Sequence, residues 1–178
     1  GQPGGFQNTA DYGTFSTVRL SSAGNTYTGG TYLHSGSLFL DTIAAMGSGP
    51  LIVDTGASDA YAALLANGNL TADIDLANGV LVVIPTDPLQ LSGDISGSGW
   101  LFADNDITLT GNNTYDGGSV FSNRANIVAG SNSALGTGSL ELLVGTYVTF
   151  TSAAPVIGSL VAPYINDARA GELPLLGG

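Results

Sequence analysis

Asp54 is the residue whose type and neighbours point most directly to chemistry. Three apolar residues precede it and Thr-Gly-Ala-Ser follows it, so a carboxylate would leave a buried strand at a tight turn. Two carboxylates that share one proton can activate water for peptide hydrolysis, because like charges about 3 Å apart cannot both ionise. No second Asp-Thr-Gly or Asp-Ser-Gly occurs in the chain. The second carboxylate would therefore have to come from another copy.

The stretch Leu51–Ser58 (LIVDTGAS) resembles the active-site strand of homodimeric, retropepsin-like aspartic proteases, and this resemblance implies a catalytic Asp54. Such enzymes also carry a later apolar pair followed by Gly and usually Arg. Val156-Ile157-Gly158 supplies the first part of that pattern, but Ser159 stands where Arg is expected. The segment also aligns with Leu140–Leu143 in an internal repeat. The sequence therefore favours a scaffold strand and turn at Asp54, with the protease as the alternative.

Two Asp-x-Asp pairs are the candidates for a metal site. Asp73 and Asp75 form one pair, and Asp104 and Asp106 form the other. Residues two apart on a strand face the same side, so each pair could present two carboxylates to Ca²⁺ at an oxygen-rich edge. The favoured interpretation is that these carboxylates keep exposed strands soluble and discourage edge pairing. We therefore expect no resident cofactor, with Ca²⁺ as the one candidate ion.

Aromatic residues and the single histidine offer little further chemistry. Trp100, Tyr27, Tyr115 and Tyr147 could together form a sugar-binding surface, although such rings more often stack inside a solenoid or seal its end. His34 has no Ser-His-Asp arrangement or metal cluster around it, and we expect a solvated strand residue.

Composition excludes several classes of partner. The 178 residues contain three Arg and no Lys, and the net charge is −11, so phosphate groups would be repelled. This argues against binding to nucleic acid, and no apolar run is long enough for a membrane-spanning helix. The chain has no Cys, which is compatible with an extracellular protein. It begins at Gly1 without Met, and we interpret it as a mature or excised piece.

An internal repeat indicates the fold. Asn-Thr-Tyr-x-Gly-Gly occurs at Asn25–Gly30 and again at Asn113–Gly118, 88 residues later, and both copies continue into a strand, a small-residue loop and Gly-x-Gly. Stacked rungs repeat the same turn chemistry, whereas sandwich strands need no such recurrence. At about 22 residues per rung, the chain predicts an all-β, right-handed parallel β-helix of roughly eight rungs. The expected corner residues are Asn25, Thr26, Tyr27, Gly29, Gly30, Asn113, Thr114, Tyr115, Gly117 and Gly118.

Short apolar segments between turn clusters are the expected strands. One short helix is expected near 58–67, where Ser58 resembles an N-cap and Gly68 a stop signal. Residues 1–16 would be an N-terminal arm or partial rung, 17–165 the body, and 166–178 a tail or linker. The expected strands are Phe15–Leu20, Thr31–Leu40, Leu51–Asp54, Leu70–Leu76, Val80–Ile84, Ile107–Thr110, Ala125–Val128, Leu140–Val144, Tyr147–Thr151 and Val156–Val161.

The repeat resembles the autotransporter-associated β-strand repeat of type V secreted passenger domains in Gram-negative bacteria. The matching residues are Ile95–Leu101, Ile107–Gly111, Asn113–Gly118 and Leu135–Leu140, with a shorter match at Asn25–Leu51. The resemblance implies a β-helix at the cell surface or released from it, and no catalytic residues. Two features depart from the family: Trp100–Asp106 replaces a Lys- and Gly-rich continuation, and the sequence contains no C-terminal membrane barrel.

These observations predict a non-enzymatic extracellular module that is structural or adhesive. Because a solenoid has two open ends, we expect self-association end to end or by strand addition, including assembly into a filament. Glycans on a host or neighbouring cell are the other expected partners. The alternatives are the homodimeric aspartic protease that uses Asp54 and a carbohydrate-binding β-solenoid.

Overall fold

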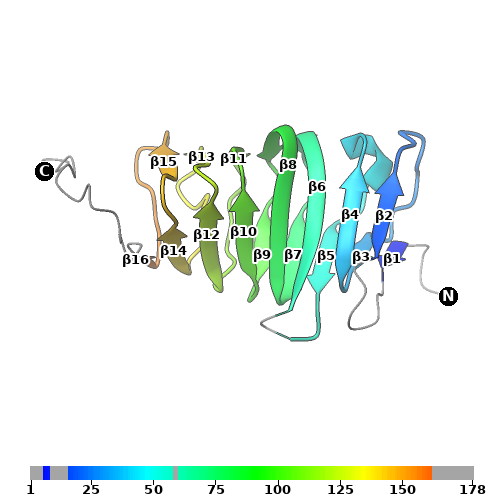
Figure 1. The fold of residues 1–178 in the computed structure, drawn as a ribbon, viewed down its shortest axis with the longest axis horizontal. Helices are drawn as coiled ribbons and strands as arrows, with labels where there is room; N and C mark the ends of the chain where they lie inside the picture. The colour runs from blue at the N-terminus through cyan, green and yellow to red at the C-terminus, as the bar shows by residue number, and fades with distance from the viewer. Residues whose placement is uncertain (1–5, 9–15, 58–59, 162–178) are drawn as a thin grey trace, which may run out of the picture.

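The computed structural model is an elongated parallel β-solenoid of about seven turns, with its two chain ends at opposite ends of the body (Figure 1). It describes residues 6–8, 16–57 and 60–161. The strands of these residues pair in parallel, and they form a 5-stranded and an 11-stranded sheet. The solenoid prediction is therefore confirmed, with about one rung fewer than expected. The tail predicted at 166–178 lies outside the described residues.

The 5-stranded sheet forms one wall of the solenoid. Its strands follow the order in which the chain makes them, so each turn of the chain adds one strand beside the last. Beyond β9, the extended segment around Thr114 continues this wall, because Thr114 N–H donates to Ile95 O at 2.8 Å. The strands are β1 (Phe6–Asn8), β3 (Thr31–Leu33), β5 (Leu51–Asp54), β7 (Ile74–Asn78) and β9 (Ile95–Gly97).

The 11-stranded sheet forms two arms that we call the first arm and the second arm. The strands β6 (Tyr61–Leu70) and β8 (Val80–Leu91) run through both arms; β8 pairs with β10 through Val80–Val83 and with β11 through Leu89–Leu91. The first arm also contains β2 (Thr17–Leu20), β4 (Gly36–Leu40), β10 (Trp100–Asp104), β12 (Gly118–Ser122), β14 (Ser139–Leu142) and β16 (Ser159–Val161). The second arm also contains β11 (Ile107–Leu109), β13 (Asn126–Ala129) and β15 (Tyr147–Phe150).

Inward-facing side chains stack in columns along the axis and make up the core. One column runs through the first arm at register-matched positions, and all five of its members have 0% exposure: Leu38, Leu64, Val83, Ala103 and Phe121. The small Ala103 lies next to the large Phe121 in this column, so the large side chain of one turn fills the core space that the small side chain of the neighbouring turn leaves. Burial of each large aliphatic side chain stabilises the fold by about 1.5–3 kcal/mol.

The helix predicted near 58–67 is wrong. Residues 61–67 belong to β6, and residues 58–59 lie outside the described part of the chain. Ala62, Leu64 and Ala66 all face the core with 0% exposure, in the two-residue period of a strand. β4 and β8 pair with β6 on its two sides, and this pairing outweighs the helix propensity of alanine and leucine. Among the described residues, the one helical element is η1 (Ile43–Met46), a 3₁₀ turn inside a predicted loop.

Candidate functional site

Asp54 lies at the end of a strand that is hydrogen-bonded on both sides. β5 pairs with β3 and with β7, and Asp54 Oδ1 accepts a hydrogen bond from Gly56 N–H at 3.2 Å. The Asp54 carbonyl lies 2.7 Å from His34 Nδ1, and Thr55 Oγ1 donates to the Ala57 carbonyl at 2.9 Å. Both motif side chains thus serve the local turn. His34, predicted to be a solvated strand residue, is half-buried between β3 and β4.

The buried corner asparagine bridges three turns of the solenoid. Asn113 is 1% exposed; its Oδ1 accepts from Ile95 N–H at 2.8 Å and its Nδ2 donates to Ala134 O at 2.6 Å. The first copy repeats the second bond, because Asn25 Nδ2 donates to Ala45 O at 2.6 Å. The amide therefore replaces a peptide group in the hydrogen-bond ladder, and satisfies backbone groups that the corner would leave unpaired.

The corner tyrosines are structural. Tyr115 is 0% exposed and its hydroxyl lies 2.5 Å from Ser119 Oγ; in the first copy Tyr27 lies 3.1 Å from Thr31 Oγ1. Burial raises the pKa of Tyr115 above its usual range, and the hydrogen bond with Ser119 offsets a smaller part of this rise. The Tyr115 ring is therefore unavailable as a sugar platform, whereas the Tyr27 ring is half-buried. Of the predicted aromatic set, Tyr147 is exposed and Trp100 is half-buried on another strand.

The corner glycines are required by close backbone approach. A Cβ on Gly136 would lie 2.4 Å from Tyr115 O, and one on Gly47 would lie 2.4 Å from Tyr27 O. Gly30 and Gly118 have φ of +86° and +132°, values that favour glycine. The structure thus brings the predicted corner residues into two matching turns. Asn25, Tyr27, Gly29 and Gly30 occupy one turn and Asn113, Tyr115, Gly117 and Gly118 the other, with Thr26 and Thr114 exposed between the inward side chains.

The two copies of the repeat lie on different faces of the solenoid. The strands after the first copy, β3 and β5, belong to the 5-stranded sheet, whereas their counterparts β12 and β14 belong to the 11-stranded sheet. The same sequence pattern, a strand that follows Gly-x-Gly, therefore occurs at Leu51–Asp54 and at Leu140–Leu143. The two strands lie on different walls of the solenoid. The recurring turns therefore do not stack at one corner, because turn lengths vary: hydrogen bonds to the next turn span 16 to 25 residues.

Three of the four aspartates of the metal hypothesis accept hydrogen bonds from the next turn. Asp73 Oδ1 accepts from Asp94 N–H at 3.0 Å, and Asp106 Oδ1 accepts from Asn126 N–H at 2.7 Å. Asp104 accepts from the hydroxyl of Ser122 in the next turn. Within the part of the chain that the structure describes, no three His, Cys, Asp or Glu residues cluster as a metal site would require. Ca²⁺ binding remains a prediction for Asp73–Asp75 and Asp104–Asp106.

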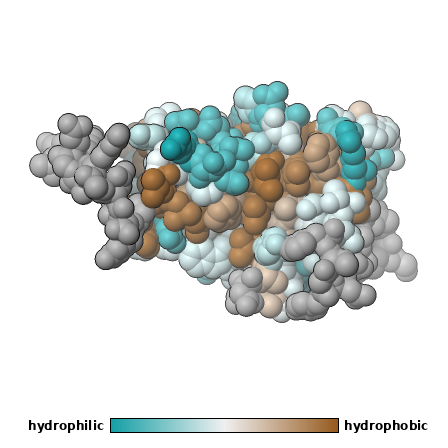
Figure 2. Space-filling view, viewed as in Figure 1, coloured by the Kyte–Doolittle hydropathy of each residue, from teal (hydrophilic) through white to brown (hydrophobic). Residues whose placement is uncertain are grey.

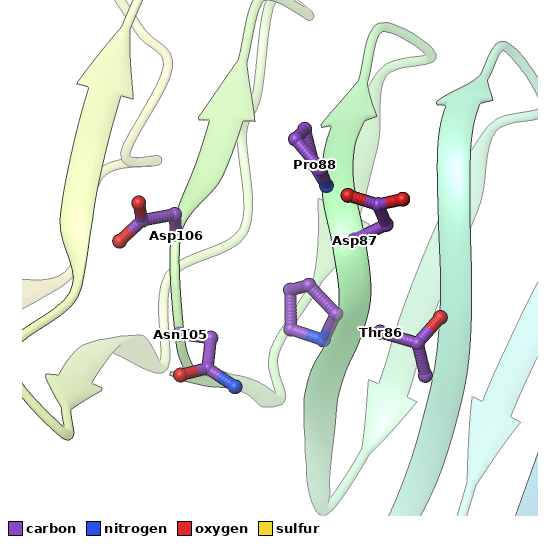
Figure 3. A pocket seen from close by; sticks show the side chains of 6 residues that line it. Thr86, Asp87, Pro88, Asn105 and Asp106 are labelled. Atoms are coloured by element: carbon purple, nitrogen blue, oxygen red, sulfur yellow. The ribbon is translucent and has the colours of Figure 1, made fainter.

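A shallow groove lies where β8 bends, beside the start of β11. It has a volume of about 320 Å³ and is lined by residues 85–88, Asn105 and Asp106. Figure 3 shows the Asp87 and Asp106 carboxylates on its two sides, with the Asn105 amide and the Thr86 hydroxyl nearby. These groups can hydrogen-bond a ligand rich in hydroxyl groups. The sequence prediction missed this site because the bend at Pro85–Pro88 follows the expected strand Val80–Ile84.

A scan against protein-family models found no match to the sequence, and searches of curated proteins and of solved structures found none either. Among the described residues, no helix combines the length and apolar character that crossing a membrane would need.

Proposed function

We propose that the chain is a non-enzymatic structural module at a cell surface, which works by stacking its solenoid end to end. The observation that carries this proposal is an open core at the C-terminal end. Leu160 is 62% exposed although its register partner Leu140 is 2% exposed, and Phe150 is 38% exposed although its partner Ala129 is 0% exposed. Side chains that face the core elsewhere are therefore uncovered at this end, and one more rung would bury them.

The N-terminal end offers a complementary rung. β2 pairs with β4, so that Val18 and Leu20 continue the inward columns of Leu38 and Leu40. Within the described residues, β16 pairs with β14 and β2 pairs with β4. Each strand therefore keeps one edge free for a parallel strand from a second copy, and such an addition would extend the sheet into a filament.

The surface location is supported by the sequence. A chain without Cys and with 10% charged residues suits an external scaffold. Its repeat resembles that of type V secreted passenger domains, which supports display outside a Gram-negative bacterium. An adhesive role would follow from the same exposed position.

Negative-stain electron microscopy and sedimentation velocity test the stacking. We expect wild-type chain to form rods that lengthen with concentration, and Leu160→Lys to abolish them because a charge would enter the inter-copy core. Val161→Lys is the matched control, since Val161 is in register with the outward Glu141. Dispersed wild-type monomers at every concentration would contradict the proposal.

Asp54→Asn tests the protease alternative separately. The substitution keeps the acceptor for Gly56 N–H, so we expect the fold and assembly to be unchanged. An acid-pH peptidase activity in the wild-type chain that this variant loses would establish the alternative.

Carbohydrate binding is a second candidate, which the groove at Pro85–Pro88 favours. Its carboxylates could accept hydrogen bonds from sugar hydroxyl groups. A glycan array should then show binding that Asp87→Asn weakens, and equal binding by wild type and variant would remove the groove from consideration.

A further inference from the structure

The outward side chains of the first arm form a continuous apolar surface. They alternate with core residues on five neighbouring strands, and we call this set the apolar face. Figure 2 shows hydrophobic residues in a stripe over this side of the solenoid. The members are Phe39 on β4, Tyr61, Ala63 and Leu65 on β6, Val80, Val82 and Ile84 on β8, Trp100 and Phe102 on β10, and Val120 on β12.

The outward assignment follows from register. Ala63, Val82 and Phe102 are matched positions on β6, β8 and β10, and each lies between two residues that face the core. Most members are half-buried by their neighbours, and Tyr61 is 47% exposed. The rings and branched side chains therefore make a broad, flat surface.

The sequence of β8 is that of a strand covered on both sides. Val80–Ile84 reads VLVVI, a continuous apolar run, and parallel strands with this pattern are usually buried on both faces of their sheet. In the solenoid, the core covers only the inner face. The outer face of β8 thus has the chemistry of a buried surface and lacks a cover within the described residues.

Other outer faces of the same solenoid carry polar residues within their outward rows. These faces mix polar and apolar positions. The outward row of the second arm contains Gln90, Thr108 and Val128, and that of the 5-stranded sheet contains Ile52, Asp75 and Ser96. The apolar face is therefore a local property of the first arm and does not follow from the fold.

Charged side chains lie at both ends of the apolar face. β2 places Arg19 at one end, where its guanidinium lies 4.9 Å from the centre of the Phe39 ring and forms an ion pair with Asp41. β14 places Glu141 at the other end, in the same outward row as Val120. From β2 to β14 the first arm has seven strands, and β8 is the central one.

We propose that the apolar face of one copy packs against the same face of a second copy, with the two solenoids antiparallel and β8 on the two-fold axis. This arrangement brings each Arg19 towards the Glu141 of the other copy, whereas parallel solenoids would bring like charges together. An isologous contact is also the commonest geometry of soluble dimers. The proposal does not depend on end-to-end stacking, which uses other residues.

The size of the face suits a dimer of moderate affinity. With the end strands β2 and β14 included, the contact spans seven strands about 4.8 Å apart and about 17 Å long. It would bury about 1,100 Å² in two copies, close to the lower end of specific interfaces. Two sheets can pack in this way about 10 Å apart with their strands nearly aligned.

Sedimentation velocity of the 178-residue chain tests the dimer. The Leu160→Lys background removes stacking, and we expect a concentration-dependent dimer there. Phe102→Glu should lower the dimer affinity by about tenfold or more, because it buries an unpaired carboxylate. The matched control is Thr108→Glu, an outward substitution on the second arm, which should leave the affinity unchanged. Circular dichroism checks that both variants fold.

Cross-linking tests the orientation of the two copies. Because the chain has no Cys, only the introduced thiols can react. In the antiparallel dimer, Ala63 on β6 of one copy faces Phe102 on β10 of the other. A short bismaleimide should therefore join Ala63→Cys chains to Phe102→Cys chains in a mixture, and should join neither variant to itself. Self-cross-linking of each variant alone would overturn the antiparallel arrangement.

A monomer at all concentrations would overturn the proposal. Flotation of that monomer with phosphatidylcholine vesicles, abolished by Phe102→Glu, would then assign the apolar face to a lipid surface.

Discussion

Asn113 shows how one side chain can replace backbone pairing at a corner of the solenoid. Its amide satisfies Ile95 N–H on one side and Ala134 C=O on the other while it is itself buried. Asn113→Ala should therefore cost about 2–5 kcal/mol, since two buried backbone groups lose their partners. Asn25→Ala removes the hydrogen bond to Ala45 O in a half-buried site and should cost about 1–2 kcal/mol. Chemical denaturation of both variants checks the difference, and equal costs would contradict the bridging role.

Tyr115 should make the solenoid sensitive to alkali. Burial raises its folded-state pKa above the unfolded value of about 10, so its contribution to stability is full below pH 10. Above pH 10 the unfolded chain releases the proton first, and the contribution falls by up to about 1.4 kcal/mol per pH unit. The stability difference between wild type and Tyr115→Phe should therefore shrink as pH rises from 9 to 11. Urea denaturation across this range measures it; a constant difference would contradict the mechanism.

At the scale of elements, the unit that recurs has two parts: a corner that contains the buried Asn and Tyr, and the glycine turn of the next rung that packs against this corner. Gly136 has φ of +69° and packs against Tyr115, whereas Gly56 has a similar φ of +75° with nothing within 4 Å of its Cβ position. Gly56→Ala should cost about 1 kcal/mol from backbone strain alone. Gly136→Ala adds a clash with the Tyr115 carbonyl and should cost at least about 2 kcal/mol more. Thermal or urea unfolding separates the two variants, and similar losses would mean that the contact with Tyr115 is unimportant.

Much of this element structure could be predicted from sequence. Leu51–Asp54 is a strand with the predicted bounds, because apolar residues and turn signals agree there. β10 and β12 were not predicted, since Trp100–Asp104 has no regular alternation and Gly118 looks like part of a turn. The helix predicted at 58–67 failed for a different reason: pairing with β4 and β8 decides the conformation of β6, and local propensity cannot report those partners.

The predicted site was less accessible to sequence reasoning than the fold. The corner glycines and asparagines could be found because their turn chemistry recurs. Their position in the solenoid could not be predicted, because loops of variable length place the second copy on another face. The apolar face was visible as the run Val80–Ile84, but a sequence pattern cannot say which side of a strand another molecule will cover.

For the whole molecule, association must overcome electrostatic repulsion. Each copy carries a net charge of −11, and the two proposed Arg19–Glu141 contacts offset only a small part of the repulsion between copies. Added salt screens interactions beyond the Debye length, which is about 10 Å at 0.1 M, and leaves apolar contact intact. Raising NaCl from about 10 to about 150 mM should therefore tighten the dimer that the apolar face is proposed to form.

Sedimentation equilibrium in the Leu160→Lys background measures this salt dependence. The two charge contacts would by themselves weaken in salt, so a dimer that loosens would show that they outweigh the net repulsion. Glu141→Gln separates the two effects, because it removes the attractive contacts and one negative charge per copy. If repulsion dominates, this variant should retain the tightening in salt, because each copy goes from a net charge of −11 to −11 + 1 = −10 and the copies still repel.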